Sequence, residues 1–283
     1  MIITTTPFTL RLTGDATSAL TTTMNRYYRV VINRPALPLA GRFLIRHHAV
    51  EDVREINDIR HPLIRECLRY LRVREGLDLT VISDLPQHES LASLAVALLH
   101  ALHAAREDEV NAEELAREAL IVLQNCGHES VTPFAAYGAA YGGVLRMHME
   151  GWHHREVVPL NIHPERLAAL QERLLLFLYH KPPAHESQSA QSGQAQALLE
   201  GDGDLDPFGA LLHDPRSTEP HYTAAYRAGA LGGTASNELG AGSLLLYAPP
   251  GKQDAVRTAL QDVPELPFSF SAAGSRMAHH IET

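Results

Sequence analysis

Hydrophobic and polar residues alternate along several short stretches of the chain, and this alternation predicts β-strands. The first predicted strand is Phe8–Leu12. The second is Tyr27–Asn33, which is rich in the β-branched and aromatic residues that strands favour. Leu174–Tyr179 is instead a continuous apolar run, so it is expected in the centre of a sheet. Further strands are predicted over residues 41–48, 77–82, 144–149, 157–158, 243–247 and 266–270.

Elsewhere, apolar residues recur every three or four positions, which predicts helices. One helix is expected from Pro62 onward, and Asn111 followed by Glu114 has the spacing of a capping box that starts another. Pro164 stands at the first position of a third helix. Other helices are predicted over residues 91–105, 205–213, 224–231 and 253–260.

The remaining segments have compositions typical of connections. Thr13–Met24 is rich in Thr and Ser, Gly232–Gly242 is rich in glycine, and residues 188–196 are the least ordered-looking part of the chain. The sequence contains no internal repeat. The alternation of strands and helices predicts two α/β layers, with a domain boundary near the helix that starts at Pro164.

One connection joins a predicted strand to a predicted helix, as a phosphate-binding loop does. Residues 83–90 read Ser-Asp-Leu-Pro-Gln-His-Glu-Ser and contain no glycine. Glycine normally lets the backbone N–H groups at the helix N-terminus approach an anion. Here His88, Glu89 and Ser90 stand in its place, and the same triplet recurs at residues 128–130 and 185–187. The loop is either a site rebuilt for other chemistry or an accident of a His-rich chain.

Composition limits the class of protein. The chain of 283 residues has room for one large or two modest domains, and its 45% hydrophobic and 20% charged residues are typical of a soluble globular protein. A net charge of −9 without a block of Lys or Arg argues against a nucleic-acid-binding surface. A small-molecule substrate is the expected partner, and a homo-oligomer is possible.

Cellular location follows from cysteine usage and from the absence of targeting signals. Cys67 and Cys126 are few and widely separated, which favours a reduced compartment. The N-terminus lacks the features of a signal peptide, and no apolar run approaches the length of a membrane span. A cytoplasmic protein without a membrane partner is expected. The 17 His residues are unusual, because histidine ligates metals and moves protons near neutral pH, although it also gathers on solvated surfaces.

Several segments, in order along nearly the whole chain, resemble the GHMP small-molecule kinases, especially their heptose 7-phosphate kinase branch. These segments are Arg60–Arg65, Ser83–Pro86, Ala95–Leu99, Ala139–Gly143, Arg173–Phe177, Gly203–His213, Gly229–Gly233 and Leu239–Gly242. The resemblance implies an α+β fold of two domains. Residues 1–165 would form a domain of the ribosomal S5 domain 2 type and residues 166–283 a ferredoxin-like α/β domain, with the active site in the cleft between them.

The chemical motifs of that family are degenerate in this chain. The family's ATP loop, Pro-x-Gly-x-Gly-Leu-Gly-Ser-Ser-Ser, matches Gln87–Ser93, where the carboxylate of Glu89 would repel a triphosphate. The family's Gly-Gly-Gly-Thr-Asp motif is reduced to Gly14–Ser18, Ala135 stands where the catalytic Asp is expected, and the C-terminal glycine motif is shortened to Gly240–Ser243. Phosphoryl transfer depends on positioning and charge stabilisation. The changes therefore predict that ordinary ATP-dependent phosphotransfer is lost.

The three His-Glu pairs offer a different chemistry. In the family fold all three would open into one cleft, so the candidate catalytic residues are His88, Glu89, His128 and Glu129. Imidazole and carboxylate groups suit Zn, Fe or Mn. The candidate metal ligands are His88, His128, His185, Glu89, Glu129 and Glu186, and the candidate substrate-binding residues are Lys181, His213, Ser90 and Ser130. No pair has the His-Glu-x-x-His spacing of a helical metal site. The same residues also fit loops that drifted to polar residues after kinase activity was lost.

Other candidates rank lower. The histidine pairs at positions 47–48 and 153–154 are expected on exposed strand ends or a hairpin tip, and the pair at 279–280 near a terminus. His61 and His213 match family positions and can be structural. His148 is expected to be packed or on the surface, although strand alternation can also point it at the cleft. Cys126 precedes His128 closely, but a structural role is preferred, and no Gly-x-Ser-x-Gly elbow is present.

The leading hypothesis is therefore a repurposed enzyme of the GHMP kinase fold. It would act on a small sugar-like or phosphorylated metabolite by metal-assisted or His/Glu acid–base chemistry. The first alternative is an ATP- and Mg-dependent sugar or sugar-phosphate kinase with altered loops. The second is a catalytically inactive pseudokinase that acts as a binding partner.

Overall fold

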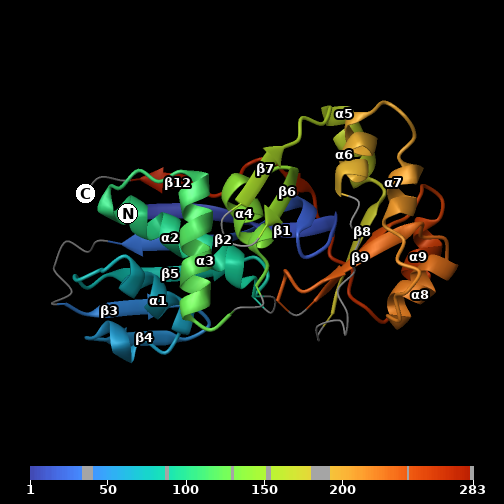
Figure 1. The fold of residues 1–283 in the computed structure, drawn as a ribbon. Helices are drawn as coiled ribbons and strands as arrows, with labels where there is room; N and C mark the ends of the chain where they lie inside the picture. Colours follow the sequence, from blue (N-terminus) through green and yellow to red (C-terminus); the bar gives the residue numbers. More distant parts are fainter. Residues whose placement is uncertain are drawn as a thin grey trace. The chain divides into compact units, whose positions relative to one another are not determined.

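The computed structural model describes residues 1–33, 41–86, 89–128, 131–150, 154–179, 192–240 and 242–280, and Figure 1 shows their course. The chain divides into two compact units. Unit 1 contains Met1–Thr9, Asn25–Gly142 and Ala273–Thr283, and unit 2 contains Leu10–Met24 and Gly143–Ala272. The chain passes between the units within its first two strands. The domain boundary expected at residues 165 and 166 stays a prediction.

The sheet of unit 1 is built on the long strands β1 (Ile2–Gly14) and β2 (Ser18–Asn33), which continue into unit 2. Its strand order is β12-β1-β2-β5-β3-β4. The other strands are β3 (Phe43–Arg46), β4 (Val50–Val53), β5 (Asp78–Ser83) and β12 (Arg276–His280). Strand β5 is antiparallel to β2, whereas β3 lies parallel to β5, with Ile45 opposite Leu79.

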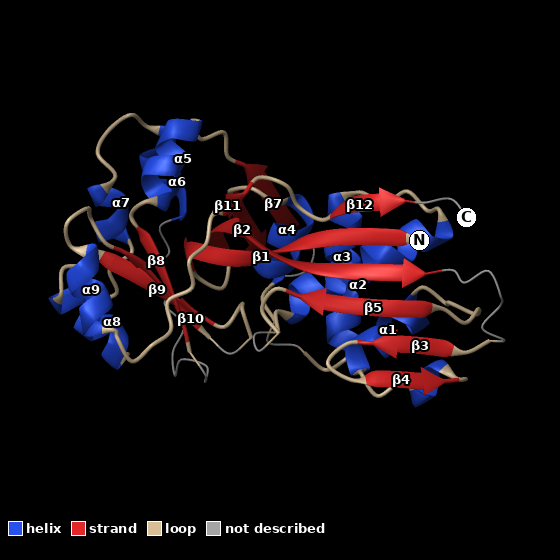
Figure 2. Ribbon diagram, turned by 180° about the vertical axis from the view of Figure 1, so that it is seen from behind, coloured by secondary structure: helices blue, strands red, loops and turns tan. Residues whose placement is uncertain are grey.

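The α-helices of unit 1 lie on one face of this sheet, in front of it in Figure 1 and behind it in Figure 2. They are α1 (Pro62–Tyr70), α2 (Leu91–Arg106), α3 (Ala112–Asn125) and α4 (Pro133–Tyr141), and a short 3-10 helix, Ile56–Asp58, precedes α1. Helix α2 contacts α1, α3 and α4, and its residues 92–99 are all buried. A helix that is apolar on nearly every side must be covered in this way.

Local signals start these helices where the sequence analysis expected them. Asn111 accepts a hydrogen bond from the N–H of Glu114, and the Glu114 side chain accepts one from the N–H of Asn111, so the predicted capping box is confirmed. Helix α1 begins with Pro62, and the imidazole of His61 caps it. His61 thereby has a structural role at the start of the helix.

Unit 2 contains the beginning of β2 and two groups of strands. Strands β6 (Leu145–Glu150) and β11 (Phe270–Ser271) pair with β2, and β7 (His154–Pro159) pairs with β6. A separate antiparallel sheet has the order β8-β10-β9, formed by Leu174–Leu178, Ser243–Tyr247 and Gly232–Ser236.

The helices described in unit 2 are α5 (Pro164–Gln171), α6 (Ser192–Glu200), α7 (Asp206–Leu211), α8 (Pro220–Arg227) and α9 (Gln253–Ala259). Side chains from β8, β10, α8 and α9 form one buried cluster, which includes Phe177, Leu244, Tyr222 and Val256. This cluster is the core of the sheet β8-β10-β9 and its helices.

Thr13–Met24 is mostly strand, so its prediction as a connection was wrong. Threonine is β-branched and favours strands, and Thr21, Thr22 and Thr23 are fully buried. The hydroxyl of Thr23 donates to the carbonyl of Ser271 at 2.6 Å. A run of buried threonines therefore belongs to the sheet, although its polar composition is that of a loop.

The apolar run at Leu174–Tyr179 forms β8, which lies at the edge of its sheet and not in the centre as predicted. The N–H of Leu178 donates to the carbonyl of Pro264, and the N–H of Leu266 donates to the carbonyl of Leu176. Residues 264–266 thus cover the outer edge of β8, and the side chains of all five of its residues are buried, which agrees with its apolar sequence.

Residues 232–236, expected as a loop, are strand β9. A Cβ atom at Gly233 would lie 2.5 Å from the carbonyl oxygen of Leu245, so glycine permits close strand packing here. Helices α4 and α6 and strands β4 and β12 were not predicted, and α6 begins within residues 188–196, which were expected to be the least ordered. In α4, a Cβ at Gly138 would lie 2.4 Å from the Cγ2 of Thr9, so small residues let this helix approach the sheet.

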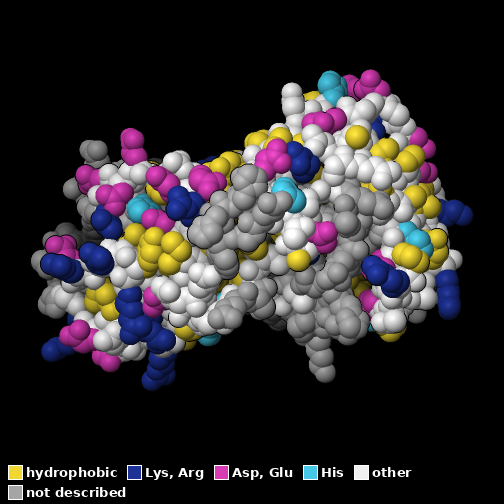
Figure 3. Space-filling view, in the orientation of Figure 1, with side chains coloured by type: hydrophobic (Ala, Val, Ile, Leu, Met, Phe, Trp, Pro, Cys, Tyr) yellow, Lys and Arg dark blue, Asp and Glu magenta, His cyan; other side chains and the backbone are white. Residues whose placement is uncertain are grey.

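No helix within the described residues is long and apolar enough to cross a membrane. On the face shown in Figure 3, Lys and Arg side chains lie beside Asp and Glu at several places. In unit 1, Arg42 pairs with Asp52 and Arg29 pairs with Asp84.

Candidate functional site

The entrance of α2 combines a strand, a loop and a helix N-terminus in unit 1. Strand β5 ends at Ser83, and Ser90 is the N-cap of α2. The hydroxyl of Ser90 donates to the hydroxyl of Ser93 at 3.2 Å, and the Ser90 side chain makes no capping hydrogen bond to the first N–H groups of the helix. Uncapped N–H groups and the helix dipole make this end of α2 electropositive.

Glu89 precedes the N-cap, and its carboxylate pairs with His61. Its Oε1 lies 3.4 Å from His61 Nε2; the Glu89 side chain is 53% exposed and the His61 side chain 9%. The hydrogen bond from His61 lowers the pKa of Glu89, although partial burial acts in the opposite direction. Glu89 is therefore a charged, accessible carboxylate beside the helix N-terminus.

The tautomer of His61 follows from its other contact. His61 Nδ1 accepts a hydrogen bond from the N–H of Ile64 at 3.4 Å, so in the neutral ring the proton is on Nε2. Nε2 then donates to Glu89. The same side chain both caps α1 and orients the carboxylate of Glu89.

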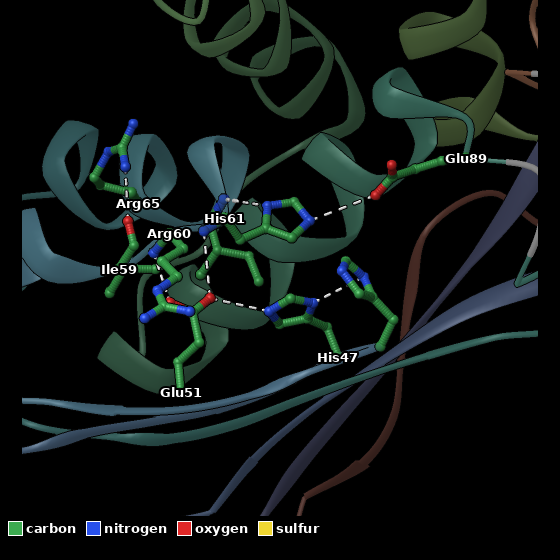
Figure 4. A network of polar contacts seen from close by, with 9 residues as sticks. His47, Glu51, Ile59, Arg60, His61, Arg65 and Glu89 are labelled. Carbon is green, nitrogen blue, oxygen red and sulfur yellow. Dashed lines mark hydrogen bonds and ion pairs between the residues drawn. The ribbon is translucent and has the colours of Figure 1, made fainter.

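A larger polar network continues from His61 to the turn between β3 and β4, as Figure 4 shows. The carboxylate of Glu51 accepts hydrogen bonds from the N–H groups of Arg60 (2.6 Å) and His61 (3.3 Å) and from His47 Nε2 (3.0 Å). Burial would raise the pKa of Glu51, but these hydrogen bonds together lower it. His47 Nδ1 lies 3.0 Å from Nδ1 of His48.

Among the predicted site residues of unit 1, His128 lies just beyond α3. Its N–H donates to the carbonyl of Leu123 at 3.0 Å, and Gly127 before it has a φ of 78°, so the backbone here ends the helix. Cys126 contacts the carbonyl of Pro62 through its Sγ, and burial, followed by the charge of Glu66, raises the pKa of its thiol. A protonated thiol agrees with the structural role expected for Cys126.

His213, a predicted substrate-binding residue, lies in unit 2. Its Nδ1 accepts from the hydroxyl of Tyr222 at 2.8 Å, since that hydroxyl itself accepts from the N–H of Asp214. Its ring stacks on Tyr226 with centroids 4.2 Å apart. These contacts fix His213 in the packing around α8, and its role toward a substrate stays a prediction.

Unit 2 also contains a buried ion pair that the sequence analysis did not single out. Arg11 Nε and Nη2 both lie 2.9 Å from Glu238 Oε1, and the two side chains are 3% and 4% exposed. Arg11 alternates with Leu10 and Leu12 in a predicted half-buried strand, a pattern that would place the Arg11 side chain on the exposed face of the sheet.

Asp15 lies in the shortened Gly14–Ser18 segment. Its carboxylate accepts hydrogen bonds from the N–H groups of Thr17 and Ser18, so that segment is a tight turn.

Most of the predicted metal set lies outside the described residues. This is true of His88, Glu129, His185 and Glu186, and also of Lys181 and Ser130. In the described part of the chain, no group of three or more His, Cys, Asp or Glu side chains is placed to hold a metal ion. Glu89 and His128 are described, and Glu89 pairs with His61. The metal site predicted from the His-Glu pairs stays a prediction.

Solved structures share this fold over the whole chain. A Campylobacter jejuni protein assigned as a sugar kinase superposes with a TM-score of 0.80 at 20% identity, covering 98% of this chain and 97% of that one. A D-glycero-D-manno-heptose 1-phosphate kinase from Bacteroides thetaiotaomicron gives 0.78 at 18% identity, with 100% of both chains covered. Lactococcus lactis galactokinase, complexed with galactose, gives 0.65 at 12% identity over 97% of this chain and 94% of that one.

The chain therefore has the α+β fold of the GHMP kinases, and the expected fold is confirmed. No protein-family model and no curated protein sequence matches the chain. At these identities the likeness defines the fold alone.

Proposed function

We propose that the chain is a small-molecule kinase that transfers a phosphoryl group from ATP to a sugar or a sugar phosphate. The observation that carries the proposal is the full-length likeness to a heptose 1-phosphate kinase and to a protein assigned as a sugar kinase. The likeness favours the ATP-dependent kinase, which was the first alternative predicted from the sequence, over the repurposed enzyme that was predicted from the degenerate motifs.

Residues at the entrance of α2 fit a magnesium-bound nucleotide. The first N–H groups of the helix attract phosphate oxygens. Carboxylate oxygens are ligands that Mg²⁺ accepts, and the accessible side chain of Glu89 provides them, whereas the hydroxyls of Ser90 and Ser93 are buried and bonded to each other. When bound, Mg²⁺ would supply charge neutralisation between the phosphates and Glu89. His61 would hold the Glu89 carboxylate in place for this contact.

A second candidate function uses Glu89 and His61 and requires no ATP. The charged carboxylate of Glu89 lies beside the imidazole of His61, and these are two kinds of group that general acid–base catalysis uses. The protein would then act on a sugar-like or phosphorylated metabolite by acid–base chemistry, with His88, His128 and Glu129 as the further catalytic residues predicted from the sequence.

Calorimetric titration with Mg²⁺ and a non-hydrolysable ATP analogue tests the first proposal. Binding that requires Mg²⁺, followed by ATP-dependent phosphorylation in a panel of aldoses, heptoses and their phosphates, is the expected result. The readouts are ADP release and ³¹P NMR of the product. Without nucleotide binding the kinase proposal fails. In that case conversion of a panel compound without ATP supports the acid–base candidate, and no ligand at all supports the inactive binding protein.

A matched variant controls for charge. Glu109→Gln removes one carboxylate at an exposed position in the segment between α2 and α3. It should leave nucleotide binding unchanged. Glu89→Gln should change the Mg²⁺ dependence of that binding.

A further inference from the structure

His47 and His48 lie in the turn between β3 and β4, and their rings are in edge-to-face contact. The turn is closed by a hydrogen bond from the N–H of His47 to the carbonyl of Ala49 at 2.9 Å. The ring centroids of the two histidines are 4.3 Å apart at an interplanar angle of 80°, and their Nδ1 atoms are 3.0 Å apart. The two Nδ1 atoms are thus direct neighbours that share one hydrogen bond at the turn.

Glu51 fixes the orientation and the tautomer of His47. The Glu51 side chain is 7% exposed, and its carboxylate accepts two backbone hydrogen bonds as well as the one from His47 Nε2. An ionised carboxylate only accepts, so His47 Nε2 carries the proton. In the neutral ring His47 Nδ1 then has a free lone pair, which accepts the Nδ1–H of His48.

This arrangement is the one that metal-binding histidines use. Such a histidine nearly always donates its other ring N–H to a carboxylate or carbonyl, which sets the tautomer and raises the basicity of the ligating nitrogen. Two imidazole nitrogens about 2.0 Å from one tetrahedral metal ion lie about 3.3 Å apart. The Nδ1 separation of 3.0 Å is close to that value.

We propose that His47 Nδ1 and His48 Nδ1 bind a divalent transition-metal ion such as Cu²⁺ or Zn²⁺, with Glu51 as the positioning residue. Imidazole suits both ions. Binding requires the proton of His48 to move from Nδ1 to Nε2, with no net proton release. His48 is exposed, so water can carry this transfer.

The surroundings support the binding of a cation. Glu89 and His61 adjoin the histidine turn, with the His47 and His61 ring centroids 4.9 Å apart, and Figure 4 shows them as neighbours. The half-exposed side chain of Glu89 can turn toward a bound ion. Two protein nitrogens with water, or with Glu89 as a third ligand, make a site of moderate affinity. The described residues hold no preformed set of three ligands.

Copper titration of the full-length, tag-free protein tests this proposal, by calorimetry and by electron paramagnetic resonance. We expect one Cu²⁺ ion whose spectrum shows two equatorial imidazole nitrogens. His48→Ala and His47→Ala should abolish this signal, and Glu51→Gln should weaken the affinity by about 10-fold to 100-fold. His163→Ala, which removes an exposed histidine in unit 2, should leave the signal intact.

Persistence of the two-nitrogen signal in His48→Ala overturns the proposal, as does a wild-type affinity no tighter than that of His48→Ala. His48 is exposed, so this variant should fold even if His47→Ala or Glu51→Gln does not. Competition between Zn²⁺ and Cu²⁺ should rank the variants by metal affinity in the same order. The test does not depend on nucleotide binding and stands whether or not the kinase proposal holds.

Discussion

His61 Nε2 lies 3.4 Å from Glu89 Oε1, so the side chain that caps α1 also holds the carboxylate at the entrance of α2. The two residues are far apart in the sequence and come from different loops. Their contact joins the start of one helix to the start of another and leaves a negative charge where the helix dipole favours it.

Replacing Glu89 by Gln should strengthen nucleotide binding in the absence of Mg²⁺. Glu89 directly precedes Ser90, the N-cap of α2, so its negative charge should repel phosphate oxygens that approach the first N–H groups of the helix. Two unit charges about 4 Å apart in water interact by roughly 1 kcal/mol, so removing the charge should change the affinity about fivefold. Calorimetry with an ATP analogue in EDTA measures the affinities of wild type and Glu89→Gln. An unchanged affinity of Glu89→Gln in EDTA would show that the nucleotide does not approach this carboxylate.

Replacing His61 by Ala should lower the free energy of unfolding by about 1 kcal/mol, because α1 loses its N-cap acceptor. His61→Asn should retain most of that stability, since Asn is among the best N-cap residues. Urea unfolding of the three proteins, followed by circular dichroism, provides the values. Equal losses in the Ala and Asn variants would mean that the cap contributes little and that the packing of His61 matters more.

Local signals explain which parts of this fold could be predicted from the sequence. The capping box at Asn111 and the proline at the start of α1 depend on neighbouring residues, and both are where the pattern placed them. The threonines of β2 were assigned to a connection, because their polar side chains hide a strand that is buried on both faces. Burial of both faces is a tertiary property.

In the candidate site too, features that depend on neighbouring residues could be predicted, and contacts that depend on the tertiary structure could not. Glu89 was identified from its place in a loop between strand and helix, but its partner was not. His61 was expected to be structural, and the contact between them requires the tertiary arrangement of α1 and the loop. The acceptor role of Glu51 depends on backbone groups nine and ten residues away. No spacing rule predicts such a contact.

His103 should make the stability of unit 1 depend on pH. Burial alone would lower its pKa, but the hydrogen bond to Glu118 (2.7 Å) and the charges of Glu118 and Asp108 raise the pKa above its usual value. A raised folded-state pKa stabilises the protein below the unfolded value of about 6.5. That contribution is lost as the pH rises through the folded value.

The difference in unfolding free energy between wild type and His103→Gln isolates this contribution. We expect the difference to be largest near pH 6 and to shrink as the pH rises. His100 on the same helix acts in the opposite sense, because burial and the nearby His103 lower its pKa; the part of this shift that His103 causes is lost in His103→Gln and offsets some of the difference. A difference that is constant with pH would show that His103 contributes by packing alone.

Replacing Arg11 by Met should destabilise the protein strongly. Arg11 and Glu238 are almost completely buried, and both Arg11 nitrogens contact the same carboxylate oxygen. Removing one partner of a buried ion pair leaves a buried charge, which costs about 3–5 kcal/mol. Urea unfolding of Arg11→Met and of the double variant Arg11→Met/Glu238→Gln measures this cost. The double variant should be the more stable of the two, because it carries no unpaired charge. Arg216→Met, at a side chain that is 83% exposed, is the control and should change the stability by less than about 0.5 kcal/mol. A loss in Arg11→Met no greater than in this control would mean that the buried pair contributes no net stability.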